Sequence, residues 1–287
     1  MPDHAALSEI DEGRPGAVPG NLKWRIISGS VLAAIALAFA YAGAKPFALL
    51  VLVVALFLSW EWGRMVRGTA SDLAFYVHAV AVSAAIVLAV AGYAAISIAV
   101  LVTAAIIMIP LAFGRGARLS ALGIFYVGVP AVALLWLRAD EPYGFAALLL
   151  VFAIVWSSDI AAYAAGRAIG GPKLWPRVSP KKTWSGFIGG CLAAGAAACA
   201  FTPFLEGASP VRLALTGIGL ALVAQLGDLA ESALKRLFGR KDASSLIPGH
   251  GGFMDRMDSI VAVATVAALL ALAIDAHAPA RALLFGS

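Results

Sequence analysis

The stretch LAFYVHAVAVSAAIVLAVAGYAAISIAVLVTAAIIMIPLAF, residues 73–113, contains no Asp, Glu, Lys or Arg. A helix needs about 20 apolar residues to cross the hydrocarbon core of a bilayer. These 41 residues are therefore too many for one span, and we expect two spans joined by a turn at Gly92. The stretch predicts a helical hairpin inside a membrane.

The composition of the whole chain also favours a membrane protein. It is 62% hydrophobic and 13% charged, with a mean hydropathy of +0.92, whereas soluble proteins are about 45–50% apolar and about 25% charged. The net charge of +5 does not predict nucleic-acid binding. The basic residues lie between apolar runs, where they set orientation and attract anionic headgroups. We expect membrane lipids as partners, and no nucleic acid.

Apolar windows on the scale of a membrane span recur along the chain. They begin at residues 26, 46, 73, 93, 119, 143, 184, 213 and 257. We therefore predict an all-α polytopic integral membrane protein of about nine transmembrane helices. Residues 1–25 would form a flexible cytoplasmic tail, residues 26–137 five N-terminal spans, and residues 138–287 a C-terminal catalytic region of four spans plus cytoplasmic loops.

The basic residues indicate the orientation of these spans. If the N-terminus is cytoplasmic and nine spans alternate, 17 Lys and Arg fall on the cytoplasmic side and four on the other. Cytoplasmic loops are enriched in Lys and Arg. The distribution therefore predicts a cytoplasmic N-terminus.

Charge is concentrated between the last two windows, in residues 227–258. These 32 positions hold five of the 16 acidic and five of the 21 basic residues. Asp228, Glu231, Ser232 and Lys235 recur at i, i+3, i+4 and i+7, which is one face of a helix. Because a buried polar stripe is costly unless it is matched, we expect it to bind charged ligands: a nucleoside triphosphate, a metal ion and a lipid phosphate.

A glycine-rich run, PGHGG at residues 248–252, follows this helix. Glycines let a backbone approach a ligand and direct its N–H groups at phosphate oxygens, although the GK[ST] ending of a Walker A loop is absent. Asp255 and Asp258 come next, and carboxylates three residues apart can share a hard cation such as Mg²⁺. The alternative for Asp258 is a helix N-cap.

A second polar region occupies residues 157–190. Asp159, Tyr163 and Arg167 share one helix face, and Asp159 lies about 12 Å from the helix end at 1.5 Å per residue. Ionisable residues at such depth are candidates for function. The alternative is a structural bridge from Asp159 to Arg167 through Tyr163.

The segment GGPKLWPRVSPKKTWSG, residues 170–186, comes next. Its glycines and prolines predict an irregular loop. Two lysines flanked by hydroxyls in SPKKT suit a polyphosphate, while the alternative is a basic loop that contacts lipid headgroups.

Two isolated polar residues have simpler interpretations. Glu61 lies at a span end, and we expect it at the membrane interface, paired with Arg64, rather than in catalysis. His78 lies within an apolar window, and we expect a neighbouring helix to satisfy it.

The run SALKRLFGRKDASSLIPGHGGFMDRMD, residues 232–258, resembles the signature of the phosphatidate cytidylyltransferases, also called CDP-diacylglycerol synthases. DIAAYAAGR from Asp159 and SPKKT from Ser179 also resemble family segments. Ser185 departs from the family, whose members often carry Glu at that position.

The resemblance implies a nucleotidyltransferase that makes CDP-diacylglycerol and pyrophosphate from CTP and phosphatidic acid with Mg²⁺. By resemblance and spacing together, the expected catalytic residues are Asp228, Ser232, Lys235 and Asp255, and the expected metal ligands are Asp228, Asp255 and Asp258. The expected substrate-binding residues are Asp159, Arg167, Ser179, Lys181, Lys182, Thr183, Arg236, His250, Gly251, Gly252 and Arg256. The resemblance also implies a homodimer, and we expect the bacterial inner membrane with the site on its cytoplasmic side.

Two other functions fit the sequence less well. A CDP-alcohol phosphotransferase would need a DGxxDGxAR-type run, which does not occur in the sequence. An ion-coupled transporter could use Asp159 and Asp228 as a relay, but transporters of that kind have broken helices paired between two halves. The clustering of polar residues in the C-terminal half favours the enzyme.

Overall fold

The computed structural model describes residues 22–69, 71–112, 116–244, 246 and 251–287, with side chains from residue 27 onward. Most of this part of the chain is helical. The long helices are α1 (Leu22–Tyr41), α2 (Ala44–Val66), α3 (Leu73–Val90), α4 (Ala94–Leu111), α5 (Ala117–Ala139), α6 (Gly144–Ala168), α7 (Trp184–Cys199), α8 (Pro210–Leu237) and α9 (Met254–Ile274). The short elements are the strands β1 (Lys173–Trp175) and β2 (Ser179–Thr183), the 3₁₀ helix η1 (Thr202–Phe204) and the C-terminal helix α10 (Pro279–Phe285).

The predicted membrane architecture is confirmed. Among the described residues, eight helical stretches are long and apolar enough to cross a bilayer, namely α2 to α6, α7 together with η1, α8 and α9. Helix α1 coincides with the remaining predicted window. At 28 residues, α8 is about 42 Å long at 1.5 Å per residue, so it is longer than the roughly 30 Å hydrocarbon core.

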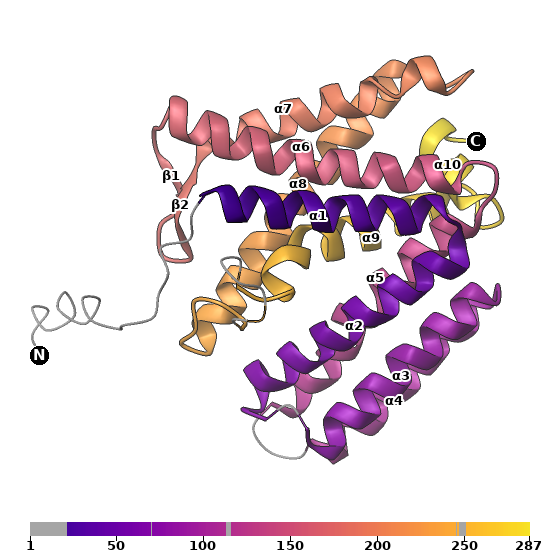
Figure 1. Cartoon of the computed structure of the whole chain (residues 1–287), viewed down its shortest axis with the longest axis vertical. Helices are drawn as coiled ribbons and strands as arrows, with labels where there is room; N and C mark the ends of the chain where they lie inside the picture. Colours follow the sequence, from indigo (N-terminus) through magenta and orange to yellow (C-terminus); the bar gives the residue numbers. More distant parts are fainter. Residues whose placement is uncertain (1–21, 70, 113–115, 245, 247–250) are drawn as a thin grey trace, which may run out of the picture.

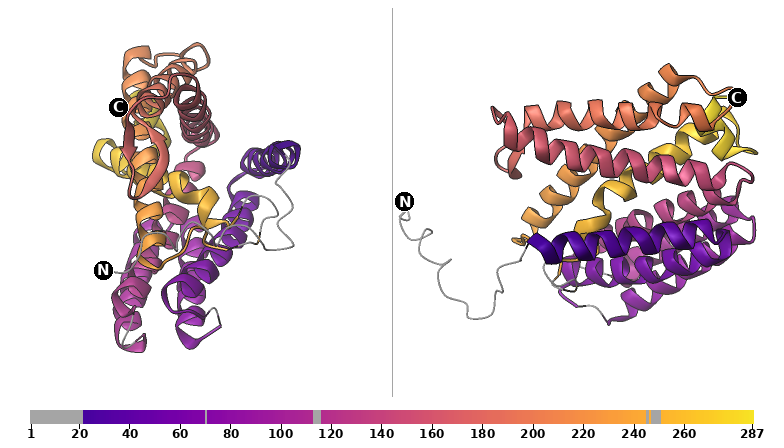
Figure 2. Two further views of the ribbon diagram at one scale, coloured as in Figure 1. Left: turned by 90° about the vertical axis from the view of Figure 1, so that its left-hand side faces the viewer. Right: turned by 45° about the horizontal axis from the view of Figure 1, so that its top comes forward.

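The helices pack in two groups. Helices α2, α3, α4 and α5 contact one another, as do α6, α7, α8 and α9, and α5 packs against α9 to join the groups. Figures 1 and 2 show α6 and α7 side by side along one edge, and in Figure 1 α1 lies below this pair and in front of α8 and α9. The β-strands lie at one end of the α6–α7 pair and α10 at the other (Figure 1). We call the end that carries the strands the hairpin end.

Small residues let the second group pack closely, as is common for membrane helices. A Cβ on Gly186 of α7 would lie 2.6 Å from the carbonyl oxygen of Ala162 on α6. A Cβ on Gly227 of α8 would lie 2.6 Å from the Cβ of Ala262 on α9. Helices α8 and α9 therefore approach closely beside Asp228.

The expectation of an irregular loop at residues 170–186 is wrong. β1 and β2 pair in antiparallel fashion, Lys173 with Thr183 and Trp175 with Ser179, with an irregular register between them. A two-stranded sheet leaves one edge of each strand unpaired, so Pro180, which has no N–H, is tolerated in β2. The hairpin fixes the SPKKT segment against the start of α7.

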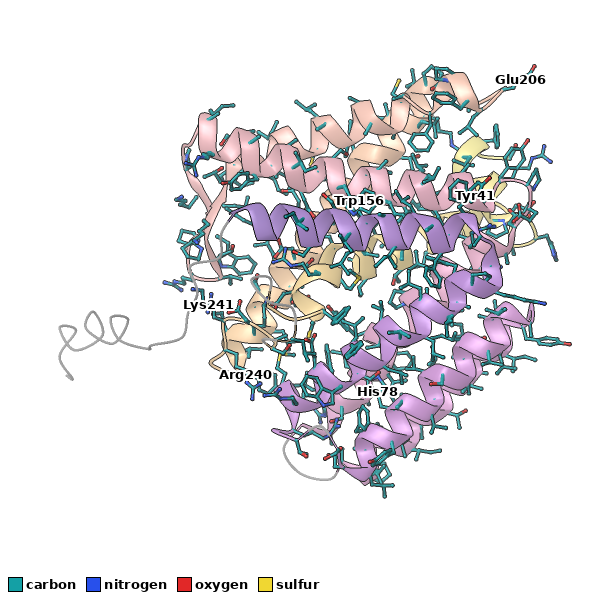
Figure 3. The ribbon with its side chains drawn as sticks, viewed as in Figure 1. Tyr41, His78, Trp156, Glu206, Arg240 and Lys241 are labelled. Carbon is teal, nitrogen blue, oxygen red and sulfur yellow. The ribbon has the colours of Figure 1, made fainter. Side chains whose placement is uncertain are left out.

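The His78 side chain on α3 is fully buried. The backbone of Gly123 on the neighbouring helix α5 approaches the ring, as expected, but neither ring nitrogen makes a hydrogen bond of good geometry within the described structure. Figure 3 shows it between helices of the first group.

The C-terminal helix α10 is too short to be recognised in the sequence. It is held by Asp140, which accepts hydrogen bonds from the Ala280 and Arg281 amides.

Candidate active site

The polar stripe predicted on α8 exists and is internally bonded. Ser232 Oγ donates to Asp228 Oδ1 at 3.3 Å, and Lys235 Nζ pairs with Glu231 Oε1 at 3.1 Å. Glu231 and Lys235 are buried, whereas Asp228 and Ser232 are half-buried. The stripe therefore runs from a partly open carboxylate to a buried ion pair.

The β-hairpin supplies a cation to this stripe. Lys182 Nζ lies 2.6 Å from Asp228 Oδ2, and the two side chains are only 22% and 31% exposed. The same ammonium group donates to the Gln225 carbonyl oxygen at 3.4 Å. Lys181, which points from the other face of β2, is exposed. Only one of the two adjacent lysines is thus held at the stripe.

Asp255 joins the stripe from the first turn of α9. Its Oδ1 lies 2.5 Å from Lys235 Nζ, and its Oδ2 accepts hydrogen bonds from the amides of Ala243 and Gly252 at 3.0 and 2.9 Å. The structure therefore brings Asp228 and Asp255 to the same end of the bundle. Each pairs with its own lysine, Asp228 with Lys182 and Asp255 with Lys235. Asp228 and Lys235 are seven residues, or about two turns, apart on α8.

The carboxylates here could hold a hard divalent cation. Asp159, on the exposed face of α6, interacts electrostatically with Asp228, and Asp258 interacts with both. Mg²⁺ prefers oxygen ligands, commonly one or two carboxylates together with substrate phosphates. Within the described residues, no group of three His, Cys, Asp or Glu side chains could hold a metal by itself. The donor set fits Mg²⁺ if phosphate oxygens of a substrate complete the coordination.

The N-cap alternative for Asp258 is wrong. Helix α9 begins at Met254 with Phe253 as its N-cap residue, so Asp258 lies inside the helix. Its Oδ1 accepts a hydrogen bond from the adjacent Ser259 amide at 2.7 Å. The side chain remains near Asp228 and Glu231.

Comparison with known proteins identifies the family of the chain. A model of the cytidylyltransferase family matches residues 23–274. The chain belongs to that family. It is 41% identical over 248 residues to a phosphatidate cytidylyltransferase of Brucella suis, which covers 86% of this chain and 92% of that protein. It is 38% identical over 276 residues to a phosphatidate cytidylyltransferase of Pseudomonas aeruginosa, covering 90% of this chain and 100% of that protein.

The family recognised from the sequence is therefore confirmed, and the chain is an enzyme. The comparisons give no support to the ion-coupled transporter. The matched region includes α1 to α9 and every expected site residue.

Several expected site residues of this cytidylyltransferase have structural partners. Thr183 caps α7, accepting a hydrogen bond from the Gly186 amide at 3.2 Å. The Gly252 amide donates a hydrogen bond to Asp255 Oδ2. Arg236 is exposed and bonds the Arg240 carbonyl oxygen at 3.3 Å. In this conformation, Thr183, Gly252 and Arg236 therefore bond to the protein itself at the hairpin end.

The remaining expected residues lie at the same end with fewer contacts. Arg167 bonds the Tyr163 hydroxyl at 3.4 Å, and the described residues contain no ion pair between Arg167 and Asp159. Arg256, on the first turn of α9, interacts electrostatically with Asp159, and Ser179 pairs with Trp175 in the hairpin. His250 lies outside the described residues.

The structure adds polar residues that were not expected in the site. Tyr126 of α5 donates from its hydroxyl to Glu231 Oε2 at 2.9 Å. Glu231 belonged to the recognised stripe, but no motif indicated Tyr126, because its partner is 105 positions away. Only the packing of α5 against the second group brings the two together.

Glu61 corrects another expectation. It is fully buried and accepts hydrogen bonds from the amides of Phe253 and Met254 at 3.0 and 2.6 Å. Arg64 instead lies over the Trp60 ring, 4.7 Å from its centroid. The carboxylate thus contacts the start of α9 rather than the membrane interface.

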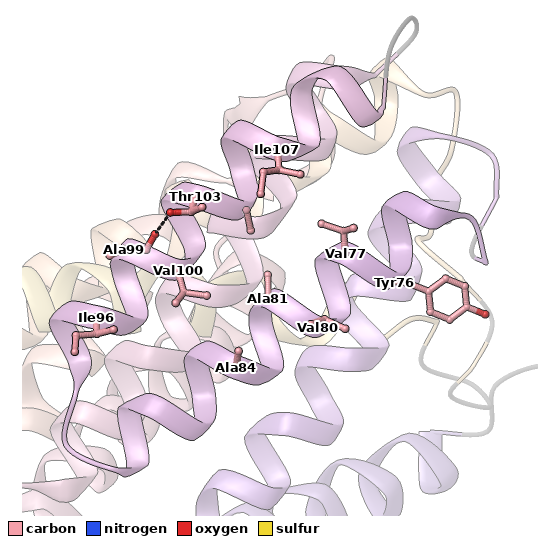
Figure 4. Close-up of a pocket in the computed structure, with 11 residues that line it drawn as sticks. Tyr76, Val77, Val80, Ala81, Ala84, Ile96, Ala99, Val100, Thr103 and Ile107 are labelled. Atoms are coloured by element: carbon pink, nitrogen blue, oxygen red, sulfur yellow. Dashed lines mark hydrogen bonds between the residues drawn. The ribbon is translucent and has the colours of Figure 1, made fainter.

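A groove on the described surface lies away from this site. A groove of about 540 Å³ between α3 and α4 is lined almost entirely by apolar side chains, including Val80, Ile96 and Ile107 (Figure 4). Thr103 in its wall bonds its own helix at the Ala99 carbonyl oxygen. The groove offers no charged group, so it does not belong to the polar site.

Proposed function

We propose that this cytidylyltransferase makes CDP-diacylglycerol and pyrophosphate from CTP and phosphatidic acid. The observation that carries the proposal is the charged cluster formed by Lys182, Asp228, Lys235 and Asp255 at one end of membrane helices. Such a cluster can gather two phosphate-bearing substrates, one of them anchored in lipid. The names of the relatives from Brucella and Pseudomonas support the choice of substrates.

The reaction is an in-line displacement. An oxygen of the lipid phosphate attacks the α-phosphorus of CTP, and the new P–O bond forms as the bond to the β-phosphate breaks and releases pyrophosphate. The lipid phosphate is already anionic, so the attack needs no strong base. The enzyme then acts by positioning the substrates and stabilising their charge.

The residues have distinct tasks in this proposal. Lys182 exchanges Asp228 for a phosphate oxygen when CTP binds, since the pair is partly open to solvent. Lys235 and Arg236 neutralise the pyrophosphate as it leaves, and Ser232 orients a phosphate. Asp228, Asp255 and Asp258 would hold Mg²⁺, which supplies charge neutralisation between the substrates.

We assign the site to the cytoplasmic side of a bacterial inner membrane. The division of basic residues, 17 against four, supports this orientation. CTP is then available from the cytosol. The stripe on α8 extends from the polar end toward the bilayer, so phosphatidic acid can reach it while its acyl chains stay in the membrane.

The homodimer implied by the family resemblance remains a prediction. Helix α7 carries exposed apolar side chains at Trp184, Ile188 and Leu192, spaced four residues apart on one face. Light scattering of the detergent-solubilised protein measures the oligomeric state directly. A mass equal to one chain would contradict the dimer.

The direct test of the proposed function uses purified protein, radiolabelled CTP, phosphatidic acid and Mg²⁺. We expect label in a lipid-soluble product and release of pyrophosphate, both abolished by a chelator and restored by Mg²⁺. Asp228→Asn should lower turnover by about 100-fold or more, the scale of losing one preorganised electrostatic group. A wild-type protein that forms no lipid-soluble cytidine product would contradict the proposal.

A further inference from the structure

The N-terminus of α9 is capped by a side chain from another helix. Phe253, its N-cap residue, makes no side-chain hydrogen bond to the helix. Glu61 of α2 takes this role, since its two carboxylate oxygens accept the amides of Phe253 and Met254. A carboxylate at this position also complements the positive end of the helix dipole.

The same carboxylate holds the segment that precedes α9. Ser244 Oγ donates to Glu61 Oε1, and the Ser244 hydroxyl in turn accepts the Leu246 amide at 3.2 Å. Glu61 therefore binds groups on both sides of residues 247–250. Its contacts lie 183 to 193 positions away in the sequence.

Gly252 leaves room for this arrangement. A Cβ at that position would lie 2.5 Å from Glu61 Oε1 and 3.1 Å from Oε2. Because Cβ atoms do not tolerate such contacts, any larger residue would push the carboxylate away from the helix start. One of the glycines in the PGHGG run is thus explained by the space that Glu61 occupies.

Two carboxylates consequently hold residues 243–244 and 252–254. Glu61 binds Ser244, Phe253 and Met254, while Asp255 binds the amides of Ala243 and Gly252 and the ammonium group of Lys235. Any shift of the α9 start would move Asp255 and Asp258 relative to α8. The position of these two side chains therefore depends on α2, a helix of the other packing group.

We propose that Glu61 is a positioning residue for nucleotidyl transfer, which fixes the start of α9 so that Asp255 and Asp258 face the α8 stripe. This inference rests on the proposed function. It assigns no contact between Glu61 and substrate. It gives the N-terminal helices a part in catalysis beyond anchoring the enzyme.

The test compares Glu61→Gln with wild type and with Glu206→Gln. Glu206 lies exposed before α8, away from the hairpin end (Figure 3). Gln retains the size of Glu but loses the charge and one acceptor. We expect Glu61→Gln to lower kcat by about 10-fold to 100-fold, the range for losing hydrogen bonds to a buried charged group, with little change in KM for CTP. Glu206→Gln should match wild type.

Hydrogen exchange gives a readout independent of turnover. In Glu61→Gln, we expect faster exchange at the amides of residues 251–256, with the centres of α8 and α9 unchanged. The positioning role requires both the loss of kcat and the faster hydrogen exchange at residues 251–256. Wild-type kcat, or unaltered exchange at residues 251–256, would overturn the positioning role.

Two further measurements distinguish failure of the positioning role from misfolding of the variant and from failure of the proposed function. If Glu61→Gln cannot be purified in a folded form, Ser244→Ala decides, because it removes one contact and leaves the carboxylate at the helix. We expect a loss of about 3-fold to 10-fold in kcat, the scale of one hydrogen bond, and wild-type kcat would overturn the inference. Inactive wild-type protein would instead reject the proposed function, while the exchange experiment would still test the capping.

Discussion

At the scale of single residues, adjacent positions in this chain have different environments. Lys181 and Lys182 are neighbours in SPKKT, yet Lys182 pairs with Asp228 and Lys181 is exposed. Successive side chains of a strand point to opposite faces. The strand β2, rather than residue type, therefore determines which lysine reaches the stripe.

This difference gives a matched pair of variants. We expect Lys182→Gln to lower kcat by about 100-fold, the scale of one preorganised electrostatic contact, and Lys181→Gln to lower it less than about 10-fold, because an exposed charge is screened by solvent. Steady-state kinetics with CTP and phosphatidic acid would compare them. Equal losses in the two variants would contradict the assignment of Lys182 to the stripe.

Ser185 shows how a departure from the family pattern is accommodated. Its hydroxyl donates to the Gly170 carbonyl oxygen and lies 3.0 Å from Thr183 Oγ1. It therefore joins the hairpin to the start of α7 and makes no described contact with the acidic stripe.

We accordingly expect Ser185→Ala to keep activity within about 3-fold while lowering the free energy of unfolding by about 1 kcal/mol, the net value of a hydrogen bond. Turnover and thermal unfolding in detergent measure the two effects. A large loss of activity with unchanged stability would show that Ser185 acts on substrate.

At the scale of elements, the approach of α8 to α9 positions the site. Gly227 contacts Ala262 across this interface, and a Cβ there would also lie 3.0 Å from the Asp258 carbonyl oxygen. Gly219 lies on the same helix, but a Cβ there would meet nothing within 4 Å. Alanine substitutions at these two positions therefore distinguish the effect of close helix packing from the effect of helix propensity.

Gly227→Ala should therefore separate α8 from α9 and lower activity by at least about 10-fold, since a displacement of about 1 Å can cost 100-fold. Gly219→Ala should be neutral or slightly stabilising because alanine favours helix by about 1 kcal/mol. Activity and unfolding temperature of both proteins test this. An active Gly227→Ala enzyme would show that the contact does not determine the geometry of the site.

At the scale of the whole molecule, α8 connects two exposed segments that lie at opposite ends of this helix. Glu206 precedes its start, and Lys241 follows its end at the hairpin end (Figure 3). Because α8 exceeds the thickness of a bilayer core, these residues should lie on opposite sides of the membrane.

Cysteine labelling tests the proposed orientation. With Cys191 and Cys199 replaced by alanine, we expect a membrane-impermeant maleimide to label Glu206→Cys in cells whose outer membrane is permeabilised, and Lys241→Cys only after the inner membrane is opened. The opposite pattern would reverse the orientation and remove the site from the cytoplasmic face.

Much of the fold could be predicted from local properties of the sequence. Runs of about 20 apolar residues cannot satisfy their backbone in lipid except as helices, so all nine predicted windows contain helices. The stripe from Asp228 to Lys235 could also be predicted, because the helix period alone aligns these residues. The motif at residues 232–258 also predicted the reaction class, nucleotidyl transfer, without any tertiary contact.

Tertiary structure alone decided which of these side chains meet. The pairing of Lys182 with Asp228, the bond of Tyr126 to Glu231 and the capping of α9 by Glu61 join residues from 46 to 193 positions apart. Spacing along one helix carries no information about its neighbours. These contacts depend on the close approach of helices at small residues, which only the packed molecule specifies.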